Sequence, residues 1–174
     1  MPRSAEHSSA PTLLYTPEQR VRRDATVWTL VQGILAPLQF LACLVSLVLV
    51  LRFLTTGAGY EAATASIIVK TILLLTIMIT GAIWEKVVFG QYLFAPAFFW
   101  EDVVSFGVIA LHLVYVAALL TGFIGPTGQM AIALVAYAAY VVNAAQFLLK
   151  LRAARLQMAA ADTGGGAIPM GAQS

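Results

Sequence analysis

The chain has 174 residues and a formal net charge of +2, with 60% hydrophobic and only 10% charged residues. Soluble domains carry about 25% charged residues, so this composition and a mean hydropathy of +0.87 exclude an ordinary soluble domain. The single cysteine, Cys43, excludes an internal disulfide, and no Cys/His spacing indicates a structural metal. The charge distribution gives no indication of nucleic-acid binding.

Residues 1–26 form a polar N-terminal segment in which a short amphipathic helix is predicted. Thr16 has the side chain of a helix cap, Pro17 suits the first helical position, and Glu18 places an acid in the first turn. The helix carries three arginines that we expect near lipid headgroups: Arg20, Arg22 and Arg23. No secretory hydrophobic region precedes the first apolar run, which we therefore expect to be a retained span.

Four apolar runs predict transmembrane helices, because each approaches the roughly 20 residues that a span requires. They cover residues 27–54, 63–83, 102–121 and 130–149. We predict an all-α polytopic membrane protein, with a four-helix transmembrane domain over 27–150 and an interfacial or re-entrant segment between helices 2 and 3. Residues 151–174 are predicted to form a cytoplasmic tail, largely disordered after Leu156 because it ends in glycines and small residues.

The Lys/Arg distribution predicts the orientation of the spans. Eight basic residues fall on the side that holds both termini, whereas the opposite side receives only Arg52. Both termini and the connection between the second and third spans should therefore be cytoplasmic. Lys70 lies within the second span, toward the opposite side, and we expect it to have a structural role there.

Polar side chains recur at helical spacing inside three spans, and such residues normally face the bundle interior. The predicted convergence includes Trp28, Gln32 and Gln39 in the first span, Glu101, Ser105 and His112 in the third, and Tyr140, Asn143, Gln146 and Phe147 in the fourth. The duller interpretation is that each amide only forms hydrogen bonds between helices. The combination at one level, however, indicates a binding site in the cytoplasmic half of the bundle.

The connection between the second and third spans is uncharged from residue 87 to residue 100 and rich in aromatic side chains, including Phe94 and Trp100. It is bordered by Glu85 and, after Trp100, by Glu101 and Asp102. Ordinary interfacial aromatics are the simpler interpretation of Trp84 and Trp100. An aromatic wall with amides beneath it and acids at its rim also suits a large, flat amphiphile.

Three stretches carry a resemblance to the vinyl bacteriochlorophyllide hydratase family. They are LYTPEQRVRRDATVWTLVQGILAPLQFL (14–41), TGAIWEKVVFGQYLFAPAFFWEDV (80–103) and YVVNAAQFLLKLRAARL (140–156). With the spans between them, the chain is similar to that family over residues 14–156. The resemblance implies a membrane-bound lyase that hydrates the 3-vinyl group of chlorophyllide a or 3-vinyl bacteriochlorophyllide a to a 1-hydroxyethyl group in bacteriochlorophyll biosynthesis.

The resemblance further implies the chlorophyllide or bacteriochlorophyllide as substrate, no organic cofactor, and an inner, intracytoplasmic photosynthetic membrane as location. Membrane lipid, other enzymes of the pathway and a second copy of the chain are the expected partners. Three alternatives stay open: a haem- or pigment-binding subunit, a transporter or assembly scaffold without catalysis, and a carotenoid hydratase. A bis-histidine haem is disfavoured because only His112 lies in a span.

Markovnikov hydration of a vinyl group needs a proton on the terminal carbon and water on the internal carbon. Desolvation disfavours the charged form of a carboxyl group, so an acid in an apolar site can act as a proton donor. We expect Glu101 as the first choice for this acid and Glu85 as the second, with Asp102 or the other glutamate accepting the water's proton. His112 is predicted to orient the water or bind the substrate magnesium, and four further groups to contact the macrocycle or the water: Gln32, Asn143, Gln146 and the aromatic rings.

Overall fold

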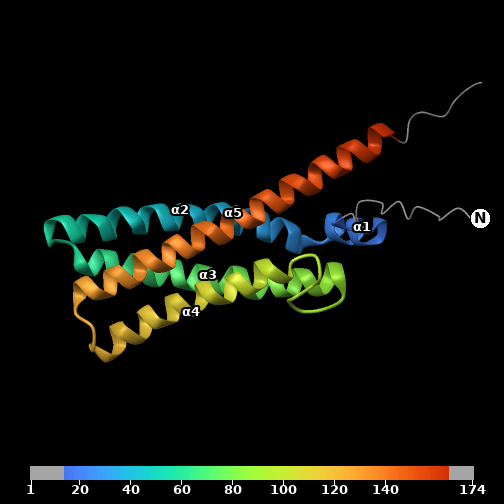
Figure 1. Ribbon diagram of the computed structural model, residues 1–174. Helices are drawn as coiled ribbons and strands as arrows, with labels where there is room; N and C mark the ends of the chain where they lie inside the picture. The colour runs from blue at the N-terminus through green and yellow to red at the C-terminus, as the bar shows by residue number, and fades with distance from the viewer. Residues whose placement is uncertain (1–13, 165–174) are drawn as a thin grey trace, which may run out of the picture.

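The computed structural model describes residues 14–164, and the side chains of residues 14–159, and is entirely helical apart from short connections (Figure 1). The helices are α1 (Pro17–Ala25), α2 (Val27–Thr56), α3 (Tyr60–Phe89), α4 (Phe99–Thr121) and α5 (Pro126–Gly164). α2, α3, α4 and the 126–159 part of α5 are long and apolar enough to cross a membrane. In the most apolar part of each, only 22–28% of the residues are buried, so most apolar side chains there are at least partly exposed on the surface of the bundle. This confirms the predicted all-α membrane fold with four spans.

α1 begins where its capping residues predict. The Thr16 hydroxyl accepts a hydrogen bond from the Gln19 backbone at 3.3 Å, and the Gln19 side chain accepts one from the Thr16 backbone at 2.9 Å. This reciprocal capping box satisfies two N–H groups that a helix start leaves free. Arg22 on α1 donates a hydrogen bond to the Val88 carbonyl at 3.1 Å, which fixes α1 against the end of α3.

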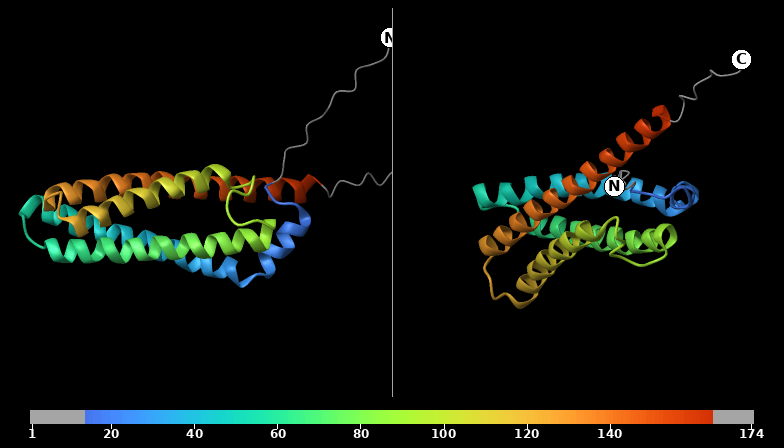
Figure 2. Two further views of the ribbon diagram at one scale, coloured as in Figure 1. Left: turned by 90° about the horizontal axis from the view of Figure 1, so that it is seen from below. Right: turned by 45° about the vertical axis from the view of Figure 1, so that its right-hand side comes forward.

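The four long helices form two antiparallel hairpins, α2 with α3 and α4 with α5, that pack face to face (Figure 2). The α2–α3 turn uses Gly57 and Gly59, both with positive φ (72° and 88°), a conformation that glycine adopts without steric cost. Among the described residues, a continuous buried core follows the bundle axis and includes Ile67, Val108 and Met130.

Two boundaries differ from the prediction. α4 begins at Phe99, three residues before Asp102, so both of its acids belong to the first helical turn. α5 continues to Gly164, well beyond Leu156, where disorder was predicted. The reason is composition: residues 151–161 consist largely of Ala, Leu, Arg, Gln and Met, which favour helix strongly. Residues 1–13, with Arg3, and residues 165–174 lie outside the described part of the chain.

Residues 90–98 connect α3 to α4 and fold back against the end of the bundle that also carries α1 (Figures 1 and 2). The segment leaves α3 at Gly90, whose φ is 87°. Ala95 and Phe98 are almost fully buried, whereas Tyr92 points outward. Segment 90–98 is therefore packed onto the helices, as its low polarity predicts, and its buried side chains lie next to the acids at the start of α4.

Candidate active site

Two buried carboxyl groups lie directly beneath segment 90–98. Glu85 comes from the last turns of α3 and Asp102 from the first turn of α4. The Ala95 N–H donates to Oε2 of Glu85 at 3.1 Å, and the Phe94 N–H donates to Oδ2 of Asp102 at 2.5 Å. The two carboxyl groups also lie within hydrogen-bonding range of each other. Two acids from different helices thus share one buried position at the end of the bundle.

Segment 90–98 carries local backbone strain where it meets these acids. Leu93 and Phe94 both have positive φ, 59° and 55°, a region that bulky residues rarely occupy. At the same place, the Phe94 N–H donates its hydrogen bond to Asp102 and the Ala95 N–H donates to Glu85. The acids therefore hold the segment in a conformation that its own side chains disfavour, which is a feature of functional segments.

Glu101 is bound differently from its neighbour Asp102. Its Oε2 lies 2.5 Å from Nζ of Lys150 on α5, and both side chains are mostly buried. Glu101, expected as the first choice for the acid, is therefore engaged by Lys150 and joins α4 to α5. This contact favours Glu85, the second choice, for the proton donor. The cause is helical geometry: adjacent residues on α4 point about 100° apart, so Glu101 faces α5 while Asp102 faces α3.

Three buried amide side chains lie deeper in the bundle than the acids, at different levels: those of Asn143, Gln146 and Gln39. Asn143 on α5 donates a hydrogen bond to the Ser105 hydroxyl on α4 at 2.8 Å. Oδ1 of Asn143 and Oε1 of Gln146 are buried and find no hydrogen-bond partner among the described residues. Gln39 on α2 is only 1% exposed, and neither atom of its amide has such a partner. The structure thus places Ser105, Asn143 and Gln146 together, as their spacing predicts.

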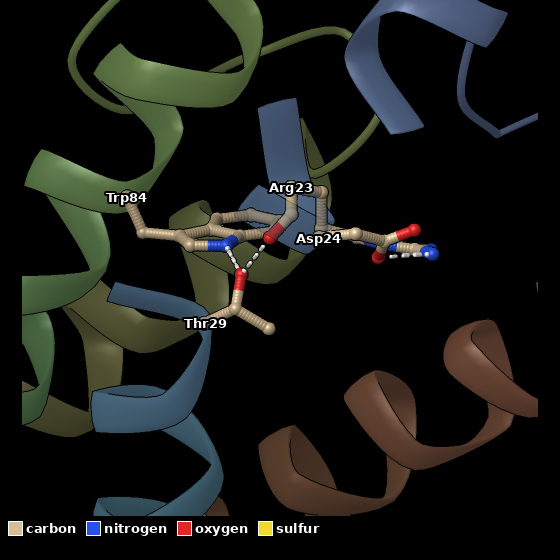
Figure 3. Close-up of polar contacts among 4 residues, drawn as sticks. All are labelled: Arg23, Asp24, Thr29 and Trp84. Carbon is tan, nitrogen blue, oxygen red and sulfur yellow. Dashed lines mark hydrogen bonds and ion pairs between the residues drawn. The ribbon is translucent and has the colours of Figure 1, made fainter. Parts of the chain in front are cut away.

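Gln32 and Trp84 have direct partners within the protein. Gln32 donates to the Thr80 hydroxyl at 2.8 Å, which joins α2 to α3. The Trp84 indole N–H donates to the Thr29 hydroxyl at 2.9 Å, and that hydroxyl donates to the Arg23 carbonyl at 2.6 Å (Figure 3). These hydrogen bonds position α1, α2 and α3 relative to one another, and they engage Nε2 of Gln32 and Nε1 of Trp84 within the protein.

An aromatic cluster adjoins the acids. Its rings have centroids 5.6–6.4 Å apart and pack directly on one another; they belong to Tyr15, Trp84, Phe89, Phe98 and Phe147. Tyr15 was not predicted, because a single tyrosine before α1 carries no periodic signal. Burial raises the pKa of its phenol, and the nearby Arg23 guanidinium opposes that shift.

Two of the predicted aromatic residues lie outside this cluster. Trp100 is 69% exposed on the outer side of α4, so it does not face the acids as expected. Phe94 stacks on Phe106 of α4, with ring centroids 5.5 Å apart, instead of on this cluster. The aromatic surface beside the acids is therefore built mainly by Trp84 and Phe98, together with Tyr15 before α1, Phe89 of α3 and Phe147 of α5.

His112 lies deeper, about 16 Å along α4 from Glu101 at 1.5 Å per residue. Its Nδ1 is 2.8 Å from the Val108 carbonyl oxygen and therefore carries the proton, so Nε2 accepts from Nζ of Lys70 at 3.3 Å. Lys70 is fully buried, with Nζ 4.0 Å from the Tyr140 ring centroid. Lys70, expected toward the opposite side of the membrane with a structural role, thus contacts His112 in the bundle interior. The expected magnesium ligation is also unsupported, because both ring nitrogens are occupied.

An apolar groove of about 420 Å³ opens between α2 and α5 at mid-bundle. Only two residues that line the groove have a polar side-chain atom, Cys43 and Tyr137. The Tyr137 hydroxyl already lies 2.5 Å from the Ser46 hydroxyl. The groove could therefore hold an apolar group, but no carboxyl group lines it. Within the described residues, a carboxyl group suited to proton donation occurs instead at the Glu85–Asp102 position.

Comparison with known proteins gives one consistent result. The family model described as 2-vinyl bacteriochlorophyllide hydratase matches residues 15–153. The protein named 2-vinyl bacteriochlorophyllide hydratase in Rhodobacter capsulatus is 71% identical over 165 residues, covering 94% of this chain and 95% of that protein. Its namesake in Cereibacter sphaeroides is 74% identical over 150 residues, covering 86% and 92%. No solved structure matches the chain. The chain belongs to the 2-vinyl bacteriochlorophyllide hydratase family.

Proposed function

We propose that the protein hydrates the vinyl group of a bacteriochlorophyllide or of chlorophyllide a in bacteriochlorophyll biosynthesis, with the buried Glu85–Asp102 pair as its acid and base. The activity follows from the family, whose two close relatives are named as hydratases of this substrate class. The acid assignment is supported by one observation above all: two carboxyl groups from different helices occupy one buried position.

Adjacent carboxyl groups in an apolar setting retain a proton between them, because two buried negative charges repel each other. In the proposed reaction Glu85 gives this proton to the terminal carbon of the vinyl group. The resulting cation on the internal carbon is delocalised into the macrocycle. Water adds at that carbon and releases a proton to the carboxylate, which restores the pair. One water is added across the double bond, and no oxidant or reductant is consumed.

Glu85 is preferred over Asp102 as the donor because of its surroundings. Its neighbour in sequence, Trp84, belongs to the aromatic cluster, and its carboxyl group is held by the backbone of segment 90–98 at 3.1 Å. If the macrocycle stacked on Trp84 and Phe98 in place of their present aromatic neighbours, its edge would lie next to the Glu85 carboxyl group. Segment 90–98 would have to move for the pigment to enter, and its strained backbone lowers the cost of that movement.

The orientation of the protein is part of the same proposal. Basic residues gather at the end that carries segment 90–98, including Arg22, Lys86 and Lys150, whereas Arg52 is at the other end of α2. The positive-inside rule then puts both termini and the active site on the cytoplasmic side of the bacterial inner membrane. The pigment substrate would then reach the site from the cytoplasmic side.

The test is hydration of chlorophyllide a by membranes that contain the expressed protein, followed as a product heavier by one water. Glu85→Gln should abolish turnover, whereas Glu61→Gln, an exposed acid in the first turn of the same helix, should leave it intact. Hydration of a carotenoid but not of the chlorophyllide would establish the rival hydratase activity. Loss of turnover in both variants would contradict the assignment of Glu85.

A further inference from the structure

A small hollow lies between the N-terminal residues around α1 and the C-terminal part of α5. Its volume is about 10 Å³, and its lining consists of Leu14, Tyr15, Arg20, Ala154, Gln157 and Met158. The α5 residues that line it belong to the extension beyond residue 150, where a tail was predicted. A space of this size holds about one water molecule or one oxygen atom of a ligand.

Two hydrogen-bond donors at this hollow have no partner among the described residues. Tyr15 is only 3% exposed and its hydroxyl is buried without a partner, and Nε of Arg20 is buried in the same way. Arg23 adds positive charge nearby: its guanidinium carbon lies 4.8 Å from the Tyr15 ring centroid, although its nitrogens bind Asp24. Buried polar groups nearly always have partners. A guanidinium only donates hydrogen bonds, so a negatively charged oxygen is the ligand that suits this hollow best.

The hollow adjoins the aromatic cluster that leads to the acids. The Tyr15 ring stacks on Phe89, with centroids 5.8 Å apart, and lies 6.4 Å from Phe98. Both of these rings contact Trp84, at 5.8 and 5.6 Å, and Trp84 directly precedes Glu85. The hollow and the Glu85 carboxyl group therefore lie at two ends of one continuous aromatic surface.

We propose that the hollow at Tyr15 and Arg20 binds the carboxylate of the pigment substrate. The inference rests on the proposed function, because a chlorophyllide carries a free carboxylate on a different pyrrole ring from its vinyl group. A macrocycle lying along the aromatic cluster would then have its vinyl group at Glu85 and its carboxylate at Arg20. The small volume of the hollow, and its continuity with the rings, favour a flat carboxylic acid over the bulkier phosphate of a lipid headgroup. Tyr15 and Arg20 are then binding residues that set the orientation of the pigment.

The methyl ester of chlorophyllide a separates this role from a structural one, since it keeps the macrocycle and the vinyl group but lacks the charge. Binding and hydration of both pigments are measured with protein in phosphatidylcholine nanodiscs. Wild-type protein should bind the free acid at least about tenfold more tightly than the ester, the scale of a hydrogen bond to a charged group. Arg20→Gln should lose most of this preference through weaker binding of the free acid, with binding of the ester unchanged within about twofold. Tyr15→Phe, which keeps the ring in the cluster, should lose part of the preference at an unchanged thermal midpoint.

Arg155→Gln is the matched control, because it removes the same charge from an exposed residue of α5 that does not line the hollow. It should keep the full preference for the free acid; an equal loss in Arg155→Gln and Arg20→Gln would show only a general attraction and overturn the proposal.

Equal binding of the two pigments by wild-type protein would overturn the carboxylate site while leaving the hydration intact. If the pigments bound alike and added phosphatidylglycerol stabilised wild type but not Arg20→Gln, the hollow would be a lipid headgroup site instead. An absence of hydration with the free-acid preference intact would contradict the proposed function and still support the carboxylate site.

Discussion

Nζ of Lys150 lies 2.5 Å from Oε2 of Glu101, and this ion pair ties the C-terminal half of α5 to the first turn of α4. It occurs beside the Glu85–Asp102 pair, yet Glu101 has a lysine partner, whereas no ion pair is found for Glu85 or Asp102 among the described residues. Three acids that are close in the fold therefore divide into a carboxylate that joins helices and a pair without a described cation partner. Spacing alone favours Glu101 as the acid, whereas the position of Lys150 is the reason that we propose Glu85 instead.

Glu101→Gln should reduce stability more than activity. The Glu101 side chain is 10% exposed and that of Lys150 26%, so the loss should fall between that of surface and buried pairs, at about 2 kcal/mol. Turnover by the folded protein should stay within about threefold of wild type, because a group that does not donate the proton contributes little to the chemical step. Thermal unfolding in detergent, together with the hydration assay, checks both parts. The reversed pair Glu101→Lys with Lys150→Glu is the control and should recover part of the lost stability.

Gly90→Ala should destabilise the protein through the start of segment 90–98. Gly90 has φ of 87°, and an added Cβ would meet nothing within 4 Å, so the cost comes from the backbone conformation alone, about 1–2 kcal/mol. Gly107→Ala, in the interior of α4 with equally open surroundings, is the matched control and should be neutral or slightly stabilising. Equal thermal midpoints for the two variants would show that the left-handed turn at Gly90 does not contribute to stability.

The effects of Lys70 and His112 substitutions on the free energy of unfolding should be strongly non-additive. His112→Leu leaves the buried Lys70 ammonium without its nitrogen acceptor, which should cost about 2–3 kcal/mol. Adding Lys70→Met removes the orphaned charge, so the double variant should be more stable than His112→Leu alone. Thermal midpoints in detergent measure this difference. Additive losses would mean that the two residues do not interact in the folded protein.

The same residues test whether His112 binds the substrate magnesium. Both of its ring nitrogens are occupied, by the Val108 carbonyl and by Lys70, so His112→Leu combined with Lys70→Met should leave the absorption spectrum of bound pigment unchanged. A shift of the pigment bands that appears only when the imidazole is removed would instead support ligation.

Local signals in the sequence predicted the features that depend on neighbouring residues. Thr16, Pro17 and Glu18 predicted the start of α1, and the apolar runs predicted the four spans. The helical spacing of the polar residues also predicted that Ser105 and Asn143 lie at one level, and the two side chains form a hydrogen bond. These successes share a cause: they need only the geometry of one helix or the chemistry of one turn.

The pairing of side chains between helices was not predictable in the same way. Whether Lys150 meets Glu101, or Lys70 meets His112, depends on the rotation and register of two helices that are distant in sequence. The rotation of α4 about its own axis also decides where Trp100 points: it was predicted to line the pocket but lies on the outer surface. The strained backbone at Leu93 and Phe94 has no signal at all, since neither residue type favours positive φ.

The central claim is that Glu85, paired with Asp102, delivers the proton. The most direct measurement compares single-turnover hydration of chlorophyllide a by Glu85→Gln, Asp102→Asn and Glu101→Gln in the same membranes, at equal amounts of folded protein. The account predicts a loss of at least about 100-fold for Glu85→Gln, the usual scale for removal of a general acid, and near-normal turnover for Glu101→Gln. Asp102→Asn should fall between them. Near-normal turnover by Glu85→Gln, with a large loss in Glu101→Gln, would contradict the account.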